Sequence, residues 1–280
     1  MITTRPHIAI AGSGLAGLHC AVSLAPTADV TVYERLPVPG GEHWEDPEHD
    51  RLVHQARRDG VRLASGTQVV RWEGDRILAV GELGGIATAD ALVVATGHRP
   101  PTRTELRIDG NRCAGVVPAT LALHLIQQRV HLGRHVVVVG DAGWAAECIA
   151  KMRSGRNDVA SIVWVGGPER SVDRDVMTMP DARVSATHGM PRISGVTVET
   201  PTTAVHLTCD CLILAGPALP YRNIDGAVMD DEPAVYAQGS AAILANAAQI
   251  GMVAAHRALE YAQAETHSHI PVLPRIGLPQ

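Results

Sequence analysis

The sequence is poor in cysteine and contains no cysteine motif. Its five cysteines, Cys20, Cys113, Cys148, Cys209 and Cys211, are an odd number without a Cys-x-x-Cys pair. Such a set fits neither a disulfide framework nor a zinc site, and we expect no metal. Cys209 and Cys211 alternate along a predicted strand, which would place both thiols on one face. Core packing explains them better than a redox pair, because a disulfide between cysteines this close in sequence is strained.

Clusters of like charge and long apolar runs are also missing. The 24 basic and 29 acidic residues give a net charge of −5 and form no runs, so neither nucleic-acid binding nor a polybasic membrane patch is indicated. The longest apolar stretch, residues 8–25, contains three regularly spaced glycines that a secretory signal does not need. No other stretch reaches the ~18 uninterrupted apolar residues of a membrane span. We therefore expect a cytoplasmic protein that binds neither nucleic acid nor membranes.

The rest of the composition is that of a folded globular chain. Phenylalanine is absent and Lys151 is the only lysine, which we interpret as a compositional bias without mechanistic meaning. Hydrophobic residues make up 46% and charged residues 19%, and this ordinary mixture argues against a disordered or fibrous protein. A length of 280 residues allows two domains at roughly 100–200 residues each.

The N-terminal segment has the pattern of a nucleotide-binding β-α-β unit. A short apolar strand at residues 7–11 is followed by a Gly-x-Gly-x-x-Gly sequence and an Ala/Leu-rich helix. Gly12 permits the tight turn, Gly14 the close approach of a pyrophosphate, and Gly17 the packing of helix on strand. Glu34 ends the next strand, at the spacing expected for a carboxylate that binds ribose hydroxyls. The alternative is a glycine-rich turn of another α/β protein.

The residues that follow resemble the two-dinucleotide-binding-domain flavoproteins, also called pyridine nucleotide-disulfide oxidoreductase-like proteins. Glu34-Arg35, followed by Gly40-Gly41, resembles the stretch in which the acid holds the FAD ribose and the glycine pair lets the backbone approach the cofactor. Ala95-Thr96-Gly97 resembles the turn at which the chain passes from the FAD domain to the second domain. The resemblance spans most of the chain and implies FAD as the cofactor.

A second strand and turn resemble the NAD(P)H-binding half of this family. The buried strand from His135 ends at Gly140, and a helix follows through Gly143 and Trp144. Ala142 replaces the middle glycine, so its methyl group should weaken nicotinamide nucleotide binding or abolish it. The strand at residues 161–165 ends without an acid for the ribose; Arg170 and Arg174 follow and either meet a 2′-phosphate or are solvated loop residues.

The C-terminal part resembles the return of the chain to the FAD domain. A strand near Val235 leads to Gly239, after which the family has an aspartate that binds the ribityl chain, and Ser240 stands there instead. A serine hydroxyl can still make one such hydrogen bond. The next helix, which contains Gln249, resembles the helix whose N-terminal end points toward the flavin. Its positive end would stabilise a reduced, anionic flavin.

We predict an α/β protein with two Rossmann-like, three-layer dinucleotide-binding domains, the second inserted in the first. The FAD-binding domain comprises residues 1–112 and 216–266, the NAD(P)-binding-like domain residues 113–215, and residues 267–280 form a tail. The bridging segment, residues 115–135, narrows the resemblance to the FAD subunits of amino-acid and imino-acid dehydrogenases, such as those of hydrogen cyanide synthase and opine oxidase.

The first hypothesis for function is an FAD-dependent oxidoreductase that passes a hydride between NAD(P)H, or a small amine or imine substrate, and the flavin. An accessory flavin-binding subunit of a multisubunit dehydrogenase is the alternative, and a redox-neutral flavin enzyme is a third. The expected partners are a small-molecule substrate and either a partner subunit or a second copy of the chain.

The sequence identifies no catalytic side chain. His43, Trp44 and His49 follow Gly41 and, with His98, are the candidates for contact with flavin or substrate, although loop histidines are often merely solvated. The full predicted set of cofactor-binding residues is Gly12, Ser13, Gly14, Leu15, Ala16, Gly17, Glu34, Arg35, Gly40, Gly41, Val69, Ala95, Thr96, Gly97, Gly239, Ser240 and Gln249 for FAD, with Gly140, Gly143 and Trp144 for the second nucleotide.

Overall fold

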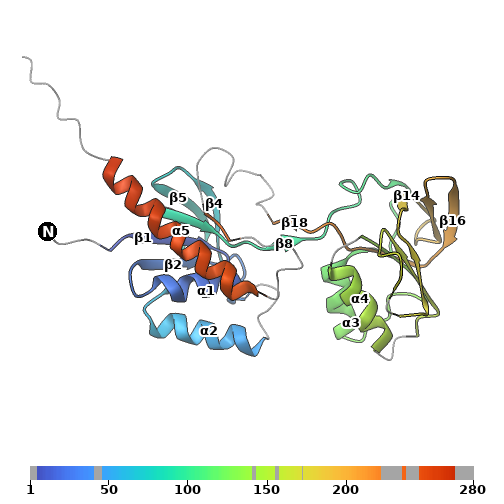
Figure 1. Ribbon diagram of the computed structural model, residues 1–280, viewed down its shortest axis with the longest axis horizontal. Coiled ribbons are helices and arrows are strands. Elements are labelled where there is room, and N and C mark those ends of the chain that lie inside the picture. The colour runs from blue at the N-terminus through green and yellow to red at the C-terminus, as the bar shows by residue number, and fades with distance from the viewer. Residues whose placement is uncertain are drawn as a thin grey trace, which may run out of the picture. The chain divides into compact units, whose positions relative to one another are not determined.

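The computed structural model describes residues 5–40, 46–140, 143–154, 158–171, 173–221, 235–237 and 246–268. These residues form two compact units (Figure 1), each built around a five-stranded sheet. All strand pairs within both of these sheets are parallel. The predicted α/β class with Rossmann-like units is confirmed.

The first unit has its central strands in the order β19-β7-β1-β2-β3. Its elements in chain order are β1 (His7–Ala11), α1 (Leu15–Leu24), β2 (Asp29–Tyr33), α2 (Pro47–Arg58), β3 (Arg62–Ala64), β4 (Thr67–Trp72), β5 (Arg76–Gly81), β6 (Gly85–Thr88), β7 (Ala91–Val94), β19 (Val235–Tyr236) and α5 (Ala247–Ser268). Strands β4, β5 and β6 form a separate antiparallel sheet.

The central strands of this unit are apolar throughout because both of their faces are covered. Ile8 and Ile10 of β1 pack with residues of α1, α2 and α5. Ala9 and Ala11 point the other way and pack with the inner face of the β4–β6 sheet. The unit therefore has three layers: helices, parallel sheet and small antiparallel sheet.

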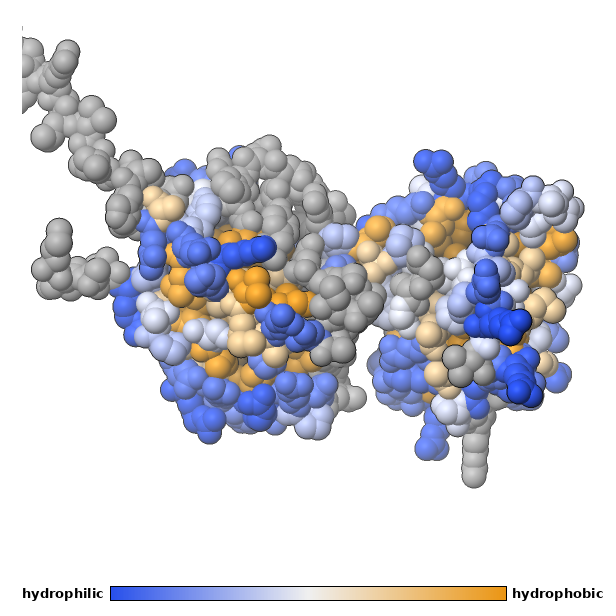
Figure 2. All heavy atoms as spheres, viewed as in Figure 1, coloured by the Kyte–Doolittle hydropathy of each residue, from blue (hydrophilic) through white to orange (hydrophobic). Residues whose placement is uncertain are grey.

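Helices α1 and α5 pack closely because small residues line their interface. A Cβ atom at Gly251 would lie 2.6 Å from the carbonyl oxygen of Ala16 and 2.7 Å from Cβ of His19. Further along α5, Ala254 and Ala258 are almost completely buried. On its outer side α5 leaves Met252 exposed, and apolar surface is visible on this side of the unit (Figure 2).

The second unit repeats the layers of the first, with its central strands in the order β10-β17-β11-β12-β13. Helices α3 and α4 cover one face of this sheet, and β14 to β16 cover the other. Its elements are β8 (His98–Arg99), β9 (Asp109–Gly110), β10 (Val116–Pro118), α3 (Ala119–Gln127), β11 (His135–Val139), α4 (Gly143–Ser154), β12 (Ser161–Val165), β13 (Val176–Met179), β14 (Arg183–His188), β15 (Gly195–Glu199), β16 (Ala204–Thr208), β17 (Cys211–Leu214) and β18 (Leu219–Pro220).

The chain passes between the units at Gly97–His98 and at Pro220–Tyr221. The sequence placed these borders near residues 112 and 215. They lie further out because β8 pairs antiparallel with β18, Arg99 with Leu219 and His98 with Pro220, so both short strands belong to the second unit.

The prediction that Cys209 and Cys211 share one face is wrong. Cys209 packs in the cluster on the β14–β16 side of the sheet, whereas Cys211 packs on the helical side. The strand alternation fails because β17 begins only at Cys211. Before it, the carboxylate of Asp210 accepts the backbone N–H groups of Arg134 and His135 at 2.9 Å each, which turns the chain. All five cysteines are free thiols.

In the part of the chain that the structure describes, no helix has the length and apolar character needed to cross a membrane. The same residues contain no cluster of three or more His, Cys, Asp or Glu side chains that could hold a metal ion.

Candidate cofactor site

The three glycines at the junction of β1 and α1 have different surroundings. Gly12 has φ +106° and a Cβ there would lie 2.3 Å from the carbonyl oxygen of Ala95; a Cβ at Gly17 would lie 2.2 Å from the carbonyl oxygen of Gly12. At Gly14, by contrast, an added Cβ would meet no atom of the described residues within 4 Å. Two glycines are thus required by contacts inside the protein, while Gly14 faces open space at the start of α1.

Glu34 places a buried carboxylate beside this loop. Its Oε2 accepts hydrogen bonds from Ser13 Oγ at 2.7 Å and from Ser13 N at 3.2 Å, and its Oε1 accepts one from Leu36 N at 2.9 Å. Ser13 Oγ also accepts the N–H of Gly40 at 2.8 Å. These bonds join the glycine loop, the end of β2 and the Gly40 turn, three segments that the sequence assigned to the cofactor.

The side chain of His49, in α2, contacts the same loop. Its Nε2 lies 3.0 Å from the carbonyl oxygen of Ser13, and only 2% of the residue is exposed. The sequence offered His49 as a side chain near the flavin or the substrate, but its described contact is with the backbone of the loop. Nothing in the spacing could reveal this contact, because 36 residues separate the two.

Tyr221 connects three further predicted residues, although the sequence gave no signal for it. Arg35 donates from Nη1 to the Tyr221 hydroxyl at 2.6 Å, and its guanidinium lies 4.5 Å above the ring. The Thr96 hydroxyl donates to the Tyr221 carbonyl oxygen at 2.5 Å, and Tyr221 N donates to the Gly97 carbonyl oxygen at 2.8 Å. Arg35 therefore contacts the side chain of Tyr221, while Thr96 and Gly97 bond to its backbone.

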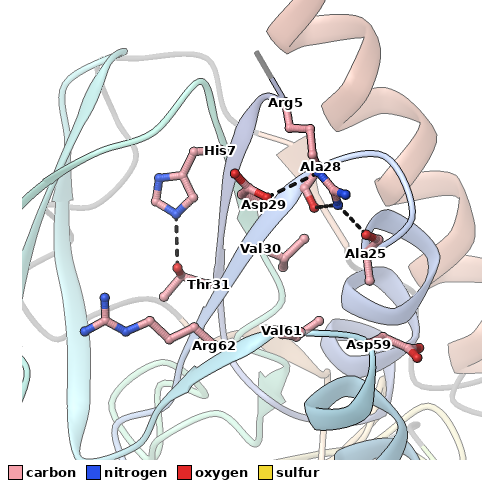
Figure 3. Close-up of a pocket in the computed structure, with 11 residues that line it drawn as sticks. Arg5, His7, Ala25, Ala28, Asp29, Val30, Thr31, Asp59, Val61 and Arg62 are labelled. Carbon is pink, nitrogen blue, oxygen red and sulfur yellow. Dashed lines mark hydrogen bonds and ion pairs between the residues drawn. The ribbon is translucent and has the colours of Figure 1, made fainter. Parts of the chain in front are cut away.

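A pocket of about 390 Å³ lies at the amino ends of β1, β2 and β3 (Figure 3). His7 Nε2 lies 3.0 Å from Thr31 Oγ1, and Arg5 pairs with Asp29 at 3.3 Å. Arg62 also lines the pocket. This is the opposite edge of the sheet from the glycine loop, which follows the carboxyl end of β1, so the pocket is not part of the candidate cofactor site.

The second unit has a comparable turn after β11. Gly140 has φ +128°, and a Cβ there would lie 2.4 Å from the backbone nitrogen of Gly216. The indole N–H of Trp164 donates to the Gly140 carbonyl oxygen at 2.6 Å. Gly143 begins α4 and Trp144 is buried. Ala142, on which the prediction of weak nicotinamide binding depends, lies outside the described residues, so that prediction stays open.

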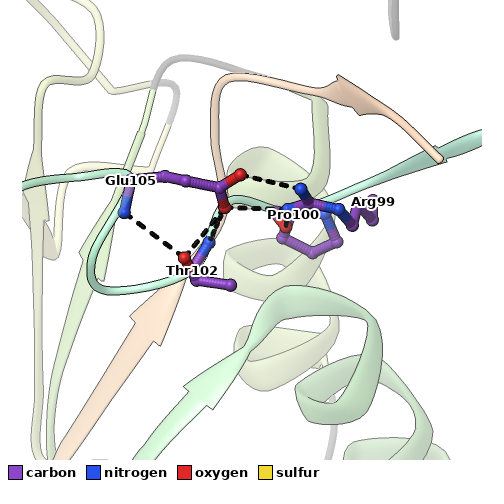
Figure 4. A network of polar contacts seen from close by, with 4 residues as sticks. All are labelled: Arg99, Pro100, Thr102 and Glu105. Carbon is purple, nitrogen blue, oxygen red and sulfur yellow. Dashed lines mark hydrogen bonds and ion pairs between the residues drawn. The ribbon is translucent and has the colours of Figure 1, made fainter. Parts of the chain in front are cut away.

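His98 belongs to β8 of the second unit, where burial lowers the pKa of its imidazole. The next residue, Arg99, donates two hydrogen bonds to the Glu105 carboxylate, at 2.7 and 2.8 Å (Figure 4). Thr102 adds its backbone N–H at 2.7 Å and its hydroxyl at 2.8 Å. The Arg99 hydrogen bonds, followed by those from Thr102, lower the pKa of Glu105 to about 2. This cluster fixes the turn after β8.

The remaining predicted residues divide between described and undescribed positions. Val69 is buried in β4 against the core beneath the antiparallel sheet, and Gln249 accepts a hydrogen bond from Asn246 at the start of α5. Leu15 and Ala16 lie in the first turn of α1. Five predicted residues lie outside the described part of the chain: Gly41, His43, Trp44, Gly239 and Ser240.

Comparison with known proteins agrees with this description. Residues 3–120 match the model of a family described as pyridine nucleotide-disulphide oxidoreductase. The structure of a thioredoxin reductase from Lactococcus lactis aligns with a TM-score of 0.66 and 14% identity over 93% of this chain and 100% of that chain. A pyridine nucleotide-disulfide family oxidoreductase from Enterococcus faecalis V583 aligns with a TM-score of 0.64 and 17% identity, covering 91% of this chain and 69% of that one.

An ornithine N-hydroxylase from Kutzneria sp. 744, solved with reduced FAD, NADP⁺ and L-ornithine, aligns with a TM-score of 0.61 and 13% identity over 80% of this chain and 83% of that one. At these identities the structural likeness shows the fold, which is the predicted one. The predicted oxidoreductase class and the predicted FAD, with NAD(P)H as the possible second cofactor, agree with the family match.

Proposed function

We propose that this chain is an FAD-dependent oxidoreductase that passes a hydride between NAD(P)H, or a small amine or imine substrate, and the flavin. The observation that carries the proposal is the open space at Gly14 beside the buried Glu34 carboxylate. A phosphate-bearing ligand can approach the start of α1 there, and the Glu34 carboxylate can accept hydrogen bonds from ribose hydroxyls.

The residues present fit an adenosine diphosphate group. The first N–H groups of a helix have no partner inside it, and α1 begins beside the space that Gly14 leaves open. Glu34 Oε1 accepts one hydrogen bond from within the chain and, with two lone pairs, can accept another from a ribose hydroxyl. FAD bound here supplies a flavin that accepts or gives a hydride, while Gly14 and Glu34 hold its nucleotide end.

Several finer assignments belong to the same proposal. The resemblance to the FAD subunits of amino-acid and imino-acid dehydrogenases supports a small amine or imine substrate. We also propose a discontinuous FAD-binding domain with the NAD(P)-binding-like domain inserted in it, a cytoplasmic location, and assembly with a partner subunit or a second copy. The remaining predicted site residues keep their assigned roles in this proposal, His43, Trp44 and His98 as candidates near the flavin or the substrate.

The cofactor is tested first, by releasing it from the purified chain and measuring its mass. FAD is expected rather than FMN, because the glycine loop and Glu34 address an adenosine diphosphate group that FMN lacks. A chain that contains FMN, or that cannot be loaded with FAD, would refute the assignment.

Stopped-flow reduction of the loaded chain separates the competing functions. We expect NADH, NADPH or a small amine to bleach the flavin within the time of one turnover. A chain that holds FAD but is reduced by none of these would instead be an accessory subunit. Ala142 and Ser240, which replace a glycine and an aspartate of the family pattern, favour this alternative. Turnover of a substrate without net electron input would identify a redox-neutral flavin enzyme.

A further inference from the structure

His49 occupies a position where the pattern of its helix calls for an apolar residue. Along α2 the buried positions are His49, Leu52, Val53 and Ala56, the spacing of one helix face directed into the core. Leu52, Val53 and Ala56 pack there with the rest of the core. A buried polar side chain costs stability unless it is hydrogen-bonded. The bond from His49 to the Ser13 carbonyl oxygen satisfies that requirement.

The direction of this hydrogen bond follows from the chemistry of the two atoms. A backbone carbonyl oxygen accepts and cannot donate, so Nε2 of His49 must carry the proton. The helix that carries His49 is capped beside it, because the Asp46 side chain accepts the N–H of Glu48 at 2.8 Å and the Asp46 carbonyl accepts that of Asp50 at 3.0 Å. His49 is thus a buried donor whose Nε2 points at the glycine loop.

Because the peptide bond is planar, the contact of His49 with the Ser13 carbonyl also sets the direction of the Gly14 N–H. In a trans peptide the C=O of one residue and the N–H of the next point in opposite directions. With the Ser13 carbonyl turned toward His49, the Gly14 N–H must point away from His49. Gly14 is the N-cap residue of α1 and borders open space. The nitrogen and hydroxyl of Ser13 are already bonded to Glu34.

We propose that His49 is a positioning residue for the dinucleotide, fixing the Ser13–Gly14 peptide so that the Gly14 N–H is aimed at the pyrophosphate of FAD. The inference rests on the proposed function, since it assumes that FAD binds at this loop. It assigns His49 a role in binding, with no part in the hydride transfer itself.

Three substitutions at one position test the role of the donor. Glutamine places its amide nitrogen at about the reach of imidazole Nε2, whereas asparagine places it near Nδ1 and falls short of the carbonyl. His49→Gln should therefore retain the hydrogen bond, while His49→Asn and His49→Leu should lose it. His19→Leu is the matched control, because His19 of α1 is also largely buried but contacts Glu48 at 3.3 Å.

The measurement is the dissociation constant of FAD for the full chain stripped of flavin, followed by quenching of flavin fluorescence. Calorimetric titration with ADP isolates the nucleotide end. Losing one hydrogen bond that orients the binding loop is expected to raise both dissociation constants about tenfold in His49→Leu and His49→Asn. His49→Gln should stay within about threefold of the unmodified chain, and His19→Leu should match it.

The Gln and Asn variants keep the test decisive if His49→Leu fails to fold, as far-UV circular dichroism would show. A purely structural role predicts that Gln and Asn bind FAD equally well, or that both weaken it alike, and either result would overturn the proposal. Wild-type affinity in His49→Asn would do the same. If the unmodified chain binds neither FAD nor ADP, the proposed function itself fails, and the variants are not needed to show it.

Discussion

At the scale of single residues, the three fingerprint glycines have different physical reasons to be glycine. Gly17 packs against the carbonyl of Gly12, so it serves the fold. A Cβ at Gly14 would meet none of the described residues, and its φ of −68° is open to any residue, so we propose that this glycine serves a ligand. The sequence motif alone cannot make this distinction, because it shows only three equivalent letters.

The contrast gives a prediction for two alanine substitutions. Gly17→Ala forces a methyl group against backbone and should lower the free energy of unfolding by about 1–3 kcal/mol. Gly14→Ala should change it by less than about 0.5 kcal/mol but weaken FAD binding at least tenfold, because the methyl group fills the space of the pyrophosphate. Urea unfolding of the flavin-free chain and FAD titration measure the two effects. Equal loss of stability in both variants would contradict this division of roles.

A second residue-scale prediction concerns the turn after β11. Because Gly140 has to accommodate the backbone of Gly216, its role in the fold is secure. Ala142 carries the methyl group at the middle position of the motif, so Ala142→Gly should tighten the binding of NADH or NADPH. Isothermal titration of both forms provides the measurement. Tight binding by the unmodified chain would show that the methyl group is no obstacle.

At the scale of secondary-structure elements, the β-α-β units were predictable and the sheets that cover them were not. Buried parallel strands such as β1 and β11 are continuous apolar runs, and glycine turns mark where they end. By contrast, β5 alternates buried Ile77 with exposed Leu78 and Val80. Because the exposed residues are apolar too, the alternation of apolar and polar residues that marks a strand is absent from the sequence. The partners of Ser13 and Arg35, which are His49 and Tyr221, lie too far along the chain for any local pattern.

The turn after β8 gives an element-scale prediction with a defined pH dependence. Because the pKa of Glu105 is lowered to about 2 in the folded chain from 4.5, its contacts stabilise the fold above pH 4.5. That contribution is lost as the pH falls through the folded value. The pair with Arg99 is partly exposed, so its contribution should stay below about 1 kcal/mol.

Glu105→Gln is the variant that measures this contribution. Its free energy of unfolding should be lower than that of the unmodified chain at pH 7, and the difference should shrink below pH 4.5 and vanish near pH 2. Urea denaturation of both chains across this range gives the difference directly. A difference that grows on acidification would have the wrong sign for a carboxylate stabilised in its charged form.

At the scale of the whole molecule, the two units share one architecture, with helices on one face of a parallel sheet and antiparallel strands on the other. Each has a glycine turn after a central strand, at Gly12 and at Gly140. The carboxylate that accompanies the first turn, Glu34, has no counterpart at the end of β12, where Gly166 and Gly167 follow. Of the two proposed nucleotide sites, the one in the first unit therefore has the more complete set of expected residues.

The distribution of thiols over the molecule gives the last prediction. Burial raises the pKa of Cys20, Cys148, Cys209 and Cys211 to about 12, whereas Cys113 is only partly buried. The thiolate is the reactive form, so iodoacetamide at pH 8 should label a single thiol of the native chain, Cys113, and all five after unfolding. Mass spectrometry of the intact chain and its peptides counts and locates the labels, and Cys113→Ser should remain unlabelled when native. Rapid native labelling at Cys209 or Cys211 would reveal a reactive dithiol, which these buried and oppositely facing side chains do not provide.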